Sequence, residues 1–196
     1  FGLNTFQIDD HWQNSMGIPK NRLGSGPLKT FAESNENFPS GMQYTAKHLK
    51  QVGFTPGLWF MPFSGDMHNP YFPKEIFAKH LWSDVPYDVK KWSGTCIDAT
   101  NPAGEKFLRE RFKRIYDWGY RYYKIDGLHT GAPSENIYVT RSYDGVPVYG
   151  SARLYNDEYT FTQCFRKGLS ILKEEAPGVF LLGCAATQNM SSFAAS

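Results

Sequence analysis

A lysine and an aspartate near the middle of the chain have the types and spacing of a paired reactive site. Lys124 and Asp126 end an aromatic-rich segment, residues 119–126, whose pattern predicts a short buried strand, and Gly127 lets the chain turn away. Side chains two positions apart on a strand share a face, so the ammonium would lie beside the carboxylate and favour its ionised form. An ionised carboxylate at the carboxyl end of a parallel strand can act as a nucleophile. A purely structural ion pair is the alternative.

Carboxylates also stand at the end of the first predicted strand. Asp9 and Asp10 close residues 3–9, a segment in which apolar and polar side chains alternate. A retaining glycoside hydrolase needs one carboxylate as nucleophile and a second carboxyl group about 5–5.5 Å away as acid/base. Two adjacent aspartates cannot fill both roles, but either can accept hydrogen bonds from sugar hydroxyls. A turn or a helix cap built on the same pair is the alternative.

The elements expected around these residues alternate between strands and helices. Strands are predicted at residues 3–9, 57–62, 95–98, 119–126 and 179–182, and helices at 40–53, 74–81, from 101 onward and 157–175, with a long loop over 128–155. Five strand–helix units in series predict a parallel α/β sheet or barrel. A doubly wound sheet would show a glycine-rich phosphate loop after its first strand, where this chain has Asp9-Asp-His-Trp12. The pattern therefore favours a (β/α)8 TIM-type barrel.

Five units are fewer than the eight of a complete barrel. We therefore expect residues 1–196 to be the N-terminal part of a catalytic (β/α)8 barrel domain, covering about the first five βα units and requiring the remainder of the barrel. An open arc of five strands would leave two unpaired edges. Asp98, at the end of the predicted third strand, either orients Lys124 or Trp59 or caps the helix that follows.

Composition argues against several other classes. The 21 Lys and Arg residues nearly balance 19 Asp and Glu, so neither nucleic acid nor an anionic membrane is an expected partner. No segment approaches about 18 consecutive apolar residues, and the first residues lack the features of a signal peptide. Cys96, Cys164 and Cys184 do not have metal-ligand spacing. Aromatic residues make up 16% of the chain and suit either a core or a sugar-binding cleft, and no compartment is predicted.

Five short motifs, in this order, resemble those of the melibiase-type α-galactosidases, retaining glycoside hydrolases of clan D with a (β/α)8 catalytic barrel. Together they span the chain from residue 1 to about residue 185. The motifs are Gln7-Ile-Asp-Asp-His-Trp-Gln13, Phe38-Pro-Ser-Gly-Met42, Gly57-Leu-Trp-Phe-Met-Pro62, Ile97-Asp-Ala-Thr-Asn-Pro102 and Tyr123-Lys-Ile-Asp-Gly127. Each motif alone is weak, but five in the family's order are a strong signal.

The resemblance implies roles for the carboxylates and the lysine. Asp126 matches the catalytic nucleophile, at the end of what would be the fourth strand. Lys124 matches a residue that contacts the sugar hydroxyls beside it. Asp9 and Asp10 match the pair that binds the 4- and 6-hydroxyls of the terminal galactose. The implied substrate is a carbohydrate.

Other positions match substrate-binding residues less securely or depart from the family. Trp12 and Trp59 match aromatic positions near the subsite for the terminal sugar. Cys184 matches a cysteine after the fifth strand, close to the 2-position of that sugar. His11 stands where Gly or Cys is often found, and Leu128 replaces a cysteine that forms a disulfide in many eukaryotic relatives.

The resemblance also implies what is missing. In the family, the acid/base aspartate lies after the sixth strand, beyond the segment that residues 1–196 supply, so the fragment alone is expected to be inactive. The implied reaction is double displacement at a terminal α-galactosyl residue, with no metal or cofactor needed. Three alternatives stay open: a transglycosidase of the raffinose-synthase type, an α-N-acetylgalactosaminidase, for which the small residues Gly183, Ala185 and Ala186 leave room, and a non-catalytic carbohydrate-binding fragment.

Overall fold

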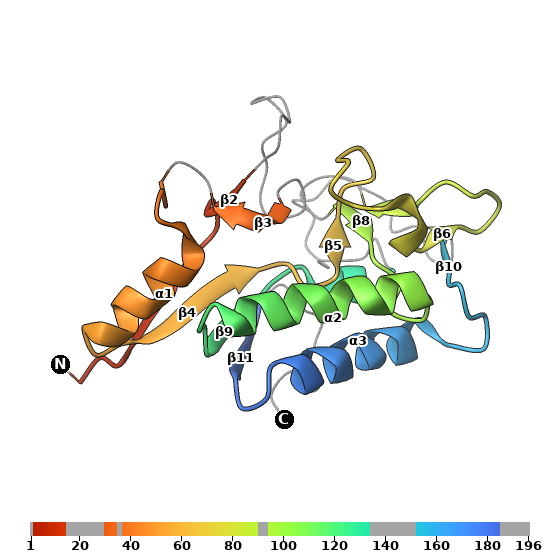
Figure 1. The fold of residues 1–196 in the computed structure, drawn as a ribbon. Coiled ribbons are helices and arrows are strands. Elements are labelled where there is room, and N and C mark those ends of the chain that lie inside the picture. Colours follow the sequence, from red (N-terminus) through yellow and green to blue (C-terminus); the bar gives the residue numbers. More distant parts are fainter. Residues whose placement is uncertain (1, 15–29, 35–36, 90–93, 134–151, 185–196) are drawn as a thin grey trace, which may run out of the picture.

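A four-stranded parallel sheet lies at the centre of the structure, a computed structural model that describes residues 2–14, 30–34, 37–89, 94–133 and 152–184. Its strands are β1 (Thr5–Ile8), β4 (Thr55–Phe60), β9 (Tyr122–Ile125) and β11 (Phe180–Gly183), in the order β1-β4-β9-β11. All three pairings are parallel (Figure 1). The chain is therefore an α/β protein with a parallel sheet, as predicted.

Within the described residues, three α-helices connect these strands and cover one face of the sheet (Figure 1). They are α1 (Gly41–Gln51), α2 (Pro102–Asp117) and α3 (Phe161–Glu175), and α2 packs against α3. Asn101 caps α2 by accepting from the Ala103 amide, and Thr160 and Gln163 form a capping box on α3. Ser40 stands at the N-cap of α1, but its side chain makes no capping hydrogen bond.

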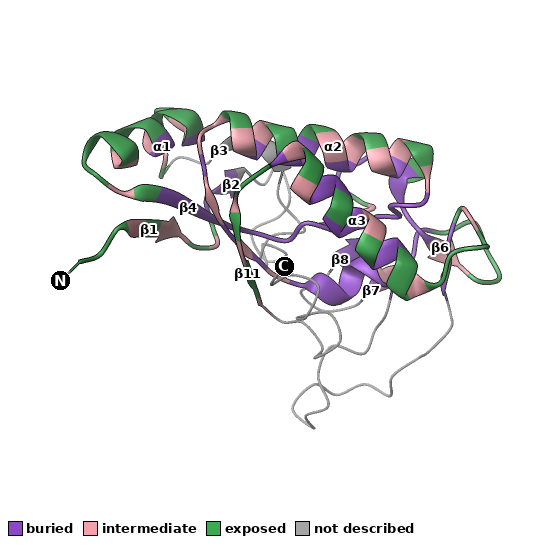
Figure 2. Cartoon of the chain, turned by 90° about the horizontal axis from the view of Figure 1, so that it is seen from below, coloured by how far each residue is buried: buried purple, intermediate pink, exposed green. Residues whose placement is uncertain are grey.

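The core lies between the sheet and the helices. Leu58, Phe60, Tyr123 and Ile125 are fully buried on the face of the sheet that the helices cover. Phe60 packs edge-on against Tyr123, with ring centroids 5.3 Å apart. Figure 2 shows β4 buried along almost its whole length and helices whose outer surfaces are exposed, whereas β1 and β11 at the edges of the sheet are not buried. The period-two pattern of the strands places the alternate side chains on the opposite, site-bearing face.

The prediction of a third parallel strand at residues 95–98 is wrong. The segment forms β8 (Gly94–Cys96), which pairs antiparallel with β5 (Ser64–Gly65) and β7 (Asp88–Val89) in a separate sheet. The described part of the parallel sheet thus contains four strands, and Asp126 follows its third strand, not a fourth. A short apolar run cannot reveal its partner strand, and here the partners are two-residue strands in an irregular segment.

Short elements complete the described chain. The helix predicted at 74–81 is reduced to the 3-10 turn η3 (Lys74–Ile76), and the predicted loop over 128–155 begins with the 3-10 helix η4 (Leu128–Gly131). Residues 134–151 of that loop lie outside the described residues. Two small antiparallel pairs join β2 (Gln13–Asn14) to β3 (Thr30–Ser34) and β6 (Lys79–His80) to β10 (Ala152–Arg153). No described helix is long and apolar enough to cross a membrane.

Candidate active site

The carboxyl ends of β4 and β9 place Trp59, Lys124 and Asp126 on the same face of the sheet. Trp59 and Lys124 are paired in register, and Asp126 follows Ile125 at the end of β9. The Asp126 amide donates to the Phe60 carbonyl at 2.9 Å, so the ladder between the two strands continues to the aspartate itself. The prediction that Lys124 and Asp126 project from one face is confirmed.

The Asp126 carboxylate is held by two hydrogen bonds. Its Oδ2 accepts from the indole Nε1 of Trp59 at 3.0 Å, and its Oδ1 accepts from the Gly127 amide at 2.7 Å. The side chain is half-buried, so both bonds act in a site with restricted access to water. The two donors fix the plane of the carboxylate.

Gly127 makes this turn possible. Its φ of 60° lies in the left-handed region, which glycine adopts without strain. A Cβ at this position would collide with Cε of Met61, which follows β4. The backbone conformation is the reason that the site needs glycine, since the Met61 methyl ends a flexible side chain that can move aside.

Lys124 forms its ion pair with Asp9, not with Asp126. The Lys124 Nζ lies 2.8 Å from Asp9 Oδ2, so the pair reaches across β4 from β9 to the end of β1. The hydrogen bond with Asp9 raises the pKa of Lys124, with burial opposing it. Burial raises the pKa of Asp9, but hydrogen bonds from Lys124, the Asp10 amide and Gln7 outweigh it and hold that pKa below its usual value. Both groups are therefore charged at neutral pH.

The turn after β1 uses the same two aspartates. Asp9 Oδ1 accepts from the Asp10 amide at 2.9 Å, and Asp10 Oδ1 accepts from the His11 amide at 2.7 Å. His11 has a positive φ of 72°, which is strained for a residue with a side chain. The turn proposed as an alternative is thus present, and Asp9 also forms the ion pair with Lys124. The Asp9 side chain remains 58% exposed.

Trp12 does not occupy the position that we expected. It is 0% exposed and packs edge-on against Trp118, with ring centroids 5.9 Å apart. Its indole Nε1 donates to the Trp59 carbonyl at 2.8 Å. A completely buried ring cannot contact a sugar, so the substrate-binding role predicted for Trp12 is corrected to positioning of Trp59. Trp59 itself is only 3% exposed, so it offers the site its N–H rather than an open ring face.

Cys184 lies where the sequence placed it, directly after β11. Its amide donates to the Ile125 carbonyl at 2.8 Å, and its thiol is close enough to Lys124 to contribute to the raised pKa of that lysine. The side chain is half-buried and forms no disulfide. Ala185 and Ala186, expected near the 2-position of a sugar, lie outside the described residues.

Asp98 has neither of the two roles that we considered for it. It is fully buried, and its Oδ1 accepts from the amide and hydroxyl of Thr100 at 2.8 and 2.7 Å. Its Oδ2 accepts from the Tyr155 amide at 2.6 Å. Asn101 caps the helix instead. Asp98 therefore ties the segment before α2 to the segment before α3, away from Lys124 and Trp59.

Two residues near the site were missed in the sequence. Gln7 Nε2 donates to Asp9 Oδ2 at 2.7 Å, and the alternation of Gln7 with Asp9 along β1 could have indicated it. Arg111, on α2, is fully buried and its Nη1 donates to the carbonyls of Pro62 and Ser64 at 2.8 and 3.0 Å. Burial lowers the pKa of Arg111 to about 10. This arginine fixes the segment that follows β4, and nothing in a helical pattern distinguishes it from a surface arginine.

A search of the described part of the chain finds no group of three or more His, Cys, Asp or Glu side chains arranged to hold a metal ion. The charged groups that meet at the strand ends are one lysine and the carboxylates of Asp9 and Asp126. In this arrangement, one carboxylate can accept hydrogen bonds from a polyhydroxylated substrate while another attacks it.

Comparison with known proteins shows which solved structures the chain resembles. No protein-family model matches the chain. The α-galactosidase TtGalA from Thermus thermophilus, solved with stachyose, is 26% identical over 97% of the chain, with a TM-score of 0.68. The GH36 α-galactosidase AgaA from Geobacillus stearothermophilus is 15% identical over 93% of the chain, with a TM-score of 0.60. A GH31 α-xylosidase from a soil metagenome, solved with xylose, is 16% identical over 98% of the chain, with a TM-score of 0.61.

The chain therefore has the fold of a part of the glycoside hydrolases. Within that class, several of the similar structures are α-galactosidases, which confirms the resemblance that the five motifs indicated. The chain spans 35% of the length of TtGalA, 23% of AgaA and 26% of the α-xylosidase. It corresponds to a fragment of those enzymes.

Proposed function

We propose that residues 1–196 are the N-terminal part of the (β/α)8 barrel of a retaining glycoside hydrolase that removes terminal α-galactosyl residues, with Asp126 as its nucleophile. The observation that carries the proposal is the Asp126 carboxylate at the carboxyl end of β9, held by Trp59 and Gly127. Active sites of such barrels form at this end of the strands. The similarity to TtGalA, solved with an α-galactoside, supports the choice of sugar.

In the proposed reaction, an Asp126 oxygen attacks the anomeric carbon as the glycosidic C–O bond breaks. An acid outside residues 1–196 gives its proton to the departing oxygen. Water then attacks the glycosyl ester while the same group accepts a proton, and the Asp126 carboxylate is released. The Trp59 and Gly127 donors are in place to stabilise this carboxylate when its charge returns.

Asp9 and Lys124 would bind the sugar as a pair of opposite polarity. The exposed Asp9 carboxylate accepts from sugar hydroxyls, while Lys124 donates to their oxygens. Gln7 and the Asp10 amide hold Asp9 before the sugar arrives, so little ordering is needed on binding. Asp10 and Cys184 would lie at the edges of the same subsite, near the 6- and 2-positions.

The test uses Asp126→Asn in the full-length protein. Turnover of p-nitrophenyl α-D-galactopyranoside should fall by several orders of magnitude, roughly 10³-fold or more, because the amide cannot form the glycosyl ester. In Asp126→Ala, where the shorter side chain leaves room for an anion, added azide should restore part of the turnover. Asp117→Asn, the same change on the exposed end of α2, is the matched control and should leave the rate unchanged.

Ordinary activity in Asp126→Asn would overturn the assignment of the nucleophile. Product analysis with excess acceptor sugar separates hydrolysis from transfer to another sugar. Parallel assays on α-N-acetylgalactosaminide and α-xyloside substrates test the choice of galactose. Binding of galactose without turnover of any of these substrates by the wild-type protein would favour the carbohydrate-binding alternative.

A further inference from the structure

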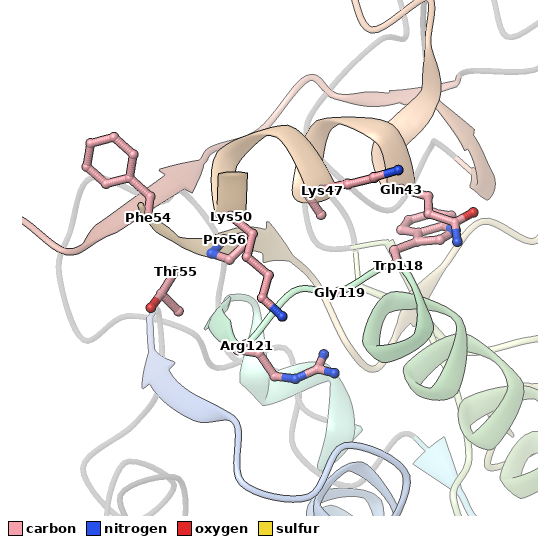
Figure 3. Close-up of a pocket in the computed structure, with 10 residues that line it drawn as sticks. Gln43, Lys47, Lys50, Phe54, Thr55, Pro56, Trp118, Gly119 and Arg121 are labelled. Carbon is pink, nitrogen blue, oxygen red and sulfur yellow. The ribbon is translucent and has the colours of Figure 1, made fainter. Parts of the chain in front are cut away.

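A second hollow lies at the opposite end of the strands from Asp126. It has a volume of about 420 Å³ and is lined by α1, by the start of β4 and by the connection from α2 to β9 (Figure 3). Its lining includes Ala46, Lys47, Lys50, Pro56, Trp118 and Arg121. Both helices and both strands that form it belong to this chain, so the hollow does not depend on further strands of a barrel. A volume of this size suits a small organic molecule.

The charged groups around the hollow are all positive. Lys47, Lys50 and Arg121 line it, and no carboxylate does. A neighbouring depression on α2 differs, because there Glu110 and Asp117 accompany Lys113, which forms an ion pair with Asp117 at 2.9 Å. Within the described residues, neither Lys47 nor Lys50 forms a salt bridge. The charged side chains that line the hollow are therefore positive, which favours an anion.

Arg121 is fixed in place without a ligand. Its Nη1 donates to the carbonyls of Tyr116 and Tyr120 at 2.8 and 2.7 Å, and its guanidinium lies 3.7 Å from the centroid of the Tyr116 ring. These contacts use one nitrogen and leave the others for a planar anion. In Figure 3 the side chains of Lys50 and Arg121 extend toward each other beneath α1. A cation held in advance loses little entropy when an anion binds.

Helix carbonyls close to the hollow do not cancel this charge. The Lys50 and His48 carbonyls at the end of α1 accept from the Gly53 and Val52 amides at 3.1 Å each. At the end of α2, the Tyr116 carbonyl accepts from the Gly119 amide at 2.9 Å as well as from Arg121. Several of the carbonyls that would repel an anion at these helix C-termini are thus already bonded.

Part of the remaining wall is apolar. Ala46, Pro56 and the ring of Trp118 form this part, beside the polar residues Gln43 and Thr55. Trp118 is held by its edge-on contact with Trp12. Gly119, with φ of 105°, places no side chain in the space, although a Cβ there would come within 3.7 Å of Ala46. The Phe54 ring points away from the hollow and packs on Phe6 (Figure 3). This wall suits a flat ring.

We propose that this hollow binds a small organic anion, a carboxylate or phosphate monoester carried on an apolar ring. The anion lies between Arg121 and Lys50, and the ring packs against Pro56 and Trp118. This binding site is separate from the proposed glycosidase site and does not depend on its chemistry.

The test follows the Trp118 indole and the Gly119 amide by NMR in the full-length protein during titration with benzoate and phenyl phosphate. Saturable shifts confined to residues around the hollow are expected, with weaker binding at high salt. The two anions distinguish carboxylate from phosphate preference. Benzamide, which has the ring without the charge, and inorganic phosphate, which has the charge without the ring, should both bind at least several-fold more weakly.

Variants give the decisive comparison. Arg121→Gln should weaken binding by roughly tenfold or more, the value of a charge-assisted hydrogen bond. Lys50→Gln, on an exposed helix surface and therefore safe for folding, should weaken it by roughly two- to fivefold. Lys106→Gln, on an exposed part of α2 away from the hollow, should change nothing. Failure of both anions to bind, equal binding of benzamide or inorganic phosphate, or unchanged binding in Lys50→Gln would overturn the proposal.

Discussion

Replacing Trp59 by phenylalanine removes the indole N–H that donates to Asp126 in the proposed mechanism. The Trp59 indole donates to Asp126 Oδ2 at 3.0 Å. The backbone carbonyl of Trp59 accepts from the Trp12 indole, which holds the residue in place. Phenylalanine keeps a ring in the buried position but has no donor. The carboxylate then retains only the Gly127 amide as a partner among the hydrogen bonds that the structure describes.

The size of the effect depends on the charge of Asp126 at each step. Attack on the sugar removes that charge, so losing the donor does not slow formation of the glycosyl ester. Release of the carboxylate restores the charge, so the second step should slow. A charge-assisted hydrogen bond is worth about 1.5–3 kcal/mol, which corresponds to roughly 10- to 150-fold in rate if the whole bond is recovered in the transition state. If half of the bond energy is recovered, the rate falls by roughly 4- to 12-fold.

The assay is stopped-flow release of nitrophenol from p-nitrophenyl α-D-galactopyranoside by the full-length protein. Trp59→Phe should show a burst of product, a kcat at least about fourfold lower and a parallel fall in KM, as expected when the glycosyl ester accumulates. Trp82→Phe is the control, since it makes the same change of ring on a side chain that is 91% exposed. An unchanged kcat in Trp59→Phe, or an equal loss in Trp82→Phe, would refute the reasoning.

Three other predictions follow from the described contacts. The pKa of Asp9 is lowered and that of Lys124 is raised, so their ion pair stabilises the fold between about pH 4 and pH 10.5. The difference in melting temperature between the wild type and Lys124→Met should therefore shrink as the pH falls below about 4. Arg111→Lys should lower the free energy of unfolding by about 1–3 kcal/mol in urea denaturation, because the shorter lysine side chain cannot place its ammonium where Arg111 Nη1 reaches the Pro62 and Ser64 carbonyls. An unchanged midpoint would contradict this. Burial raises the pKa of the Cys164 thiol to about 12, so iodoacetamide at pH 8 should label the half-buried Cys184 well before Cys164, as mass spectrometry would show.

The sequence predicted the long and strongly patterned elements well. The strands that became β1, β4, β9 and β11 carry apolar runs bounded by turn residues, and α2 and α3 carry a clear helical period with recognisable caps. The prediction for residues 95–98 failed because a three-residue strand is too short for its periodicity to reveal whether its partners are parallel or antiparallel. The helix predicted at residues 74–81 failed for a related reason, because the few apolar residues of this short segment are buried without forming an α-helix.

Local spacing predicted the shared face of Lys124 and Asp126, but not their partners. The ion pair of Lys124 is with Asp9, 115 positions away in the chain, and the indole bonded to Asp126 is 67 positions away. Such contacts are set by the order and register of the strands, which a single sequence does not contain. The burial of Trp12 depends on Trp118 in the same way.

The hydrogen bonds that join the strand ends also select among misfolded alternatives. A slip of one residue between β4 and β9 would turn Trp59 toward the helices and Leu58 and Phe60 toward the open face. The indole could then no longer reach Asp126, and a similar slip of β1 would separate Asp9 from Lys124. The groups assigned to catalysis thus stabilise the native pairing against its nearest competitors. A variant at one of these positions can therefore yield two populations of molecules, one with native strand pairing and slow turnover and one with shifted pairing and no activity. Titration of active sites is needed to distinguish them.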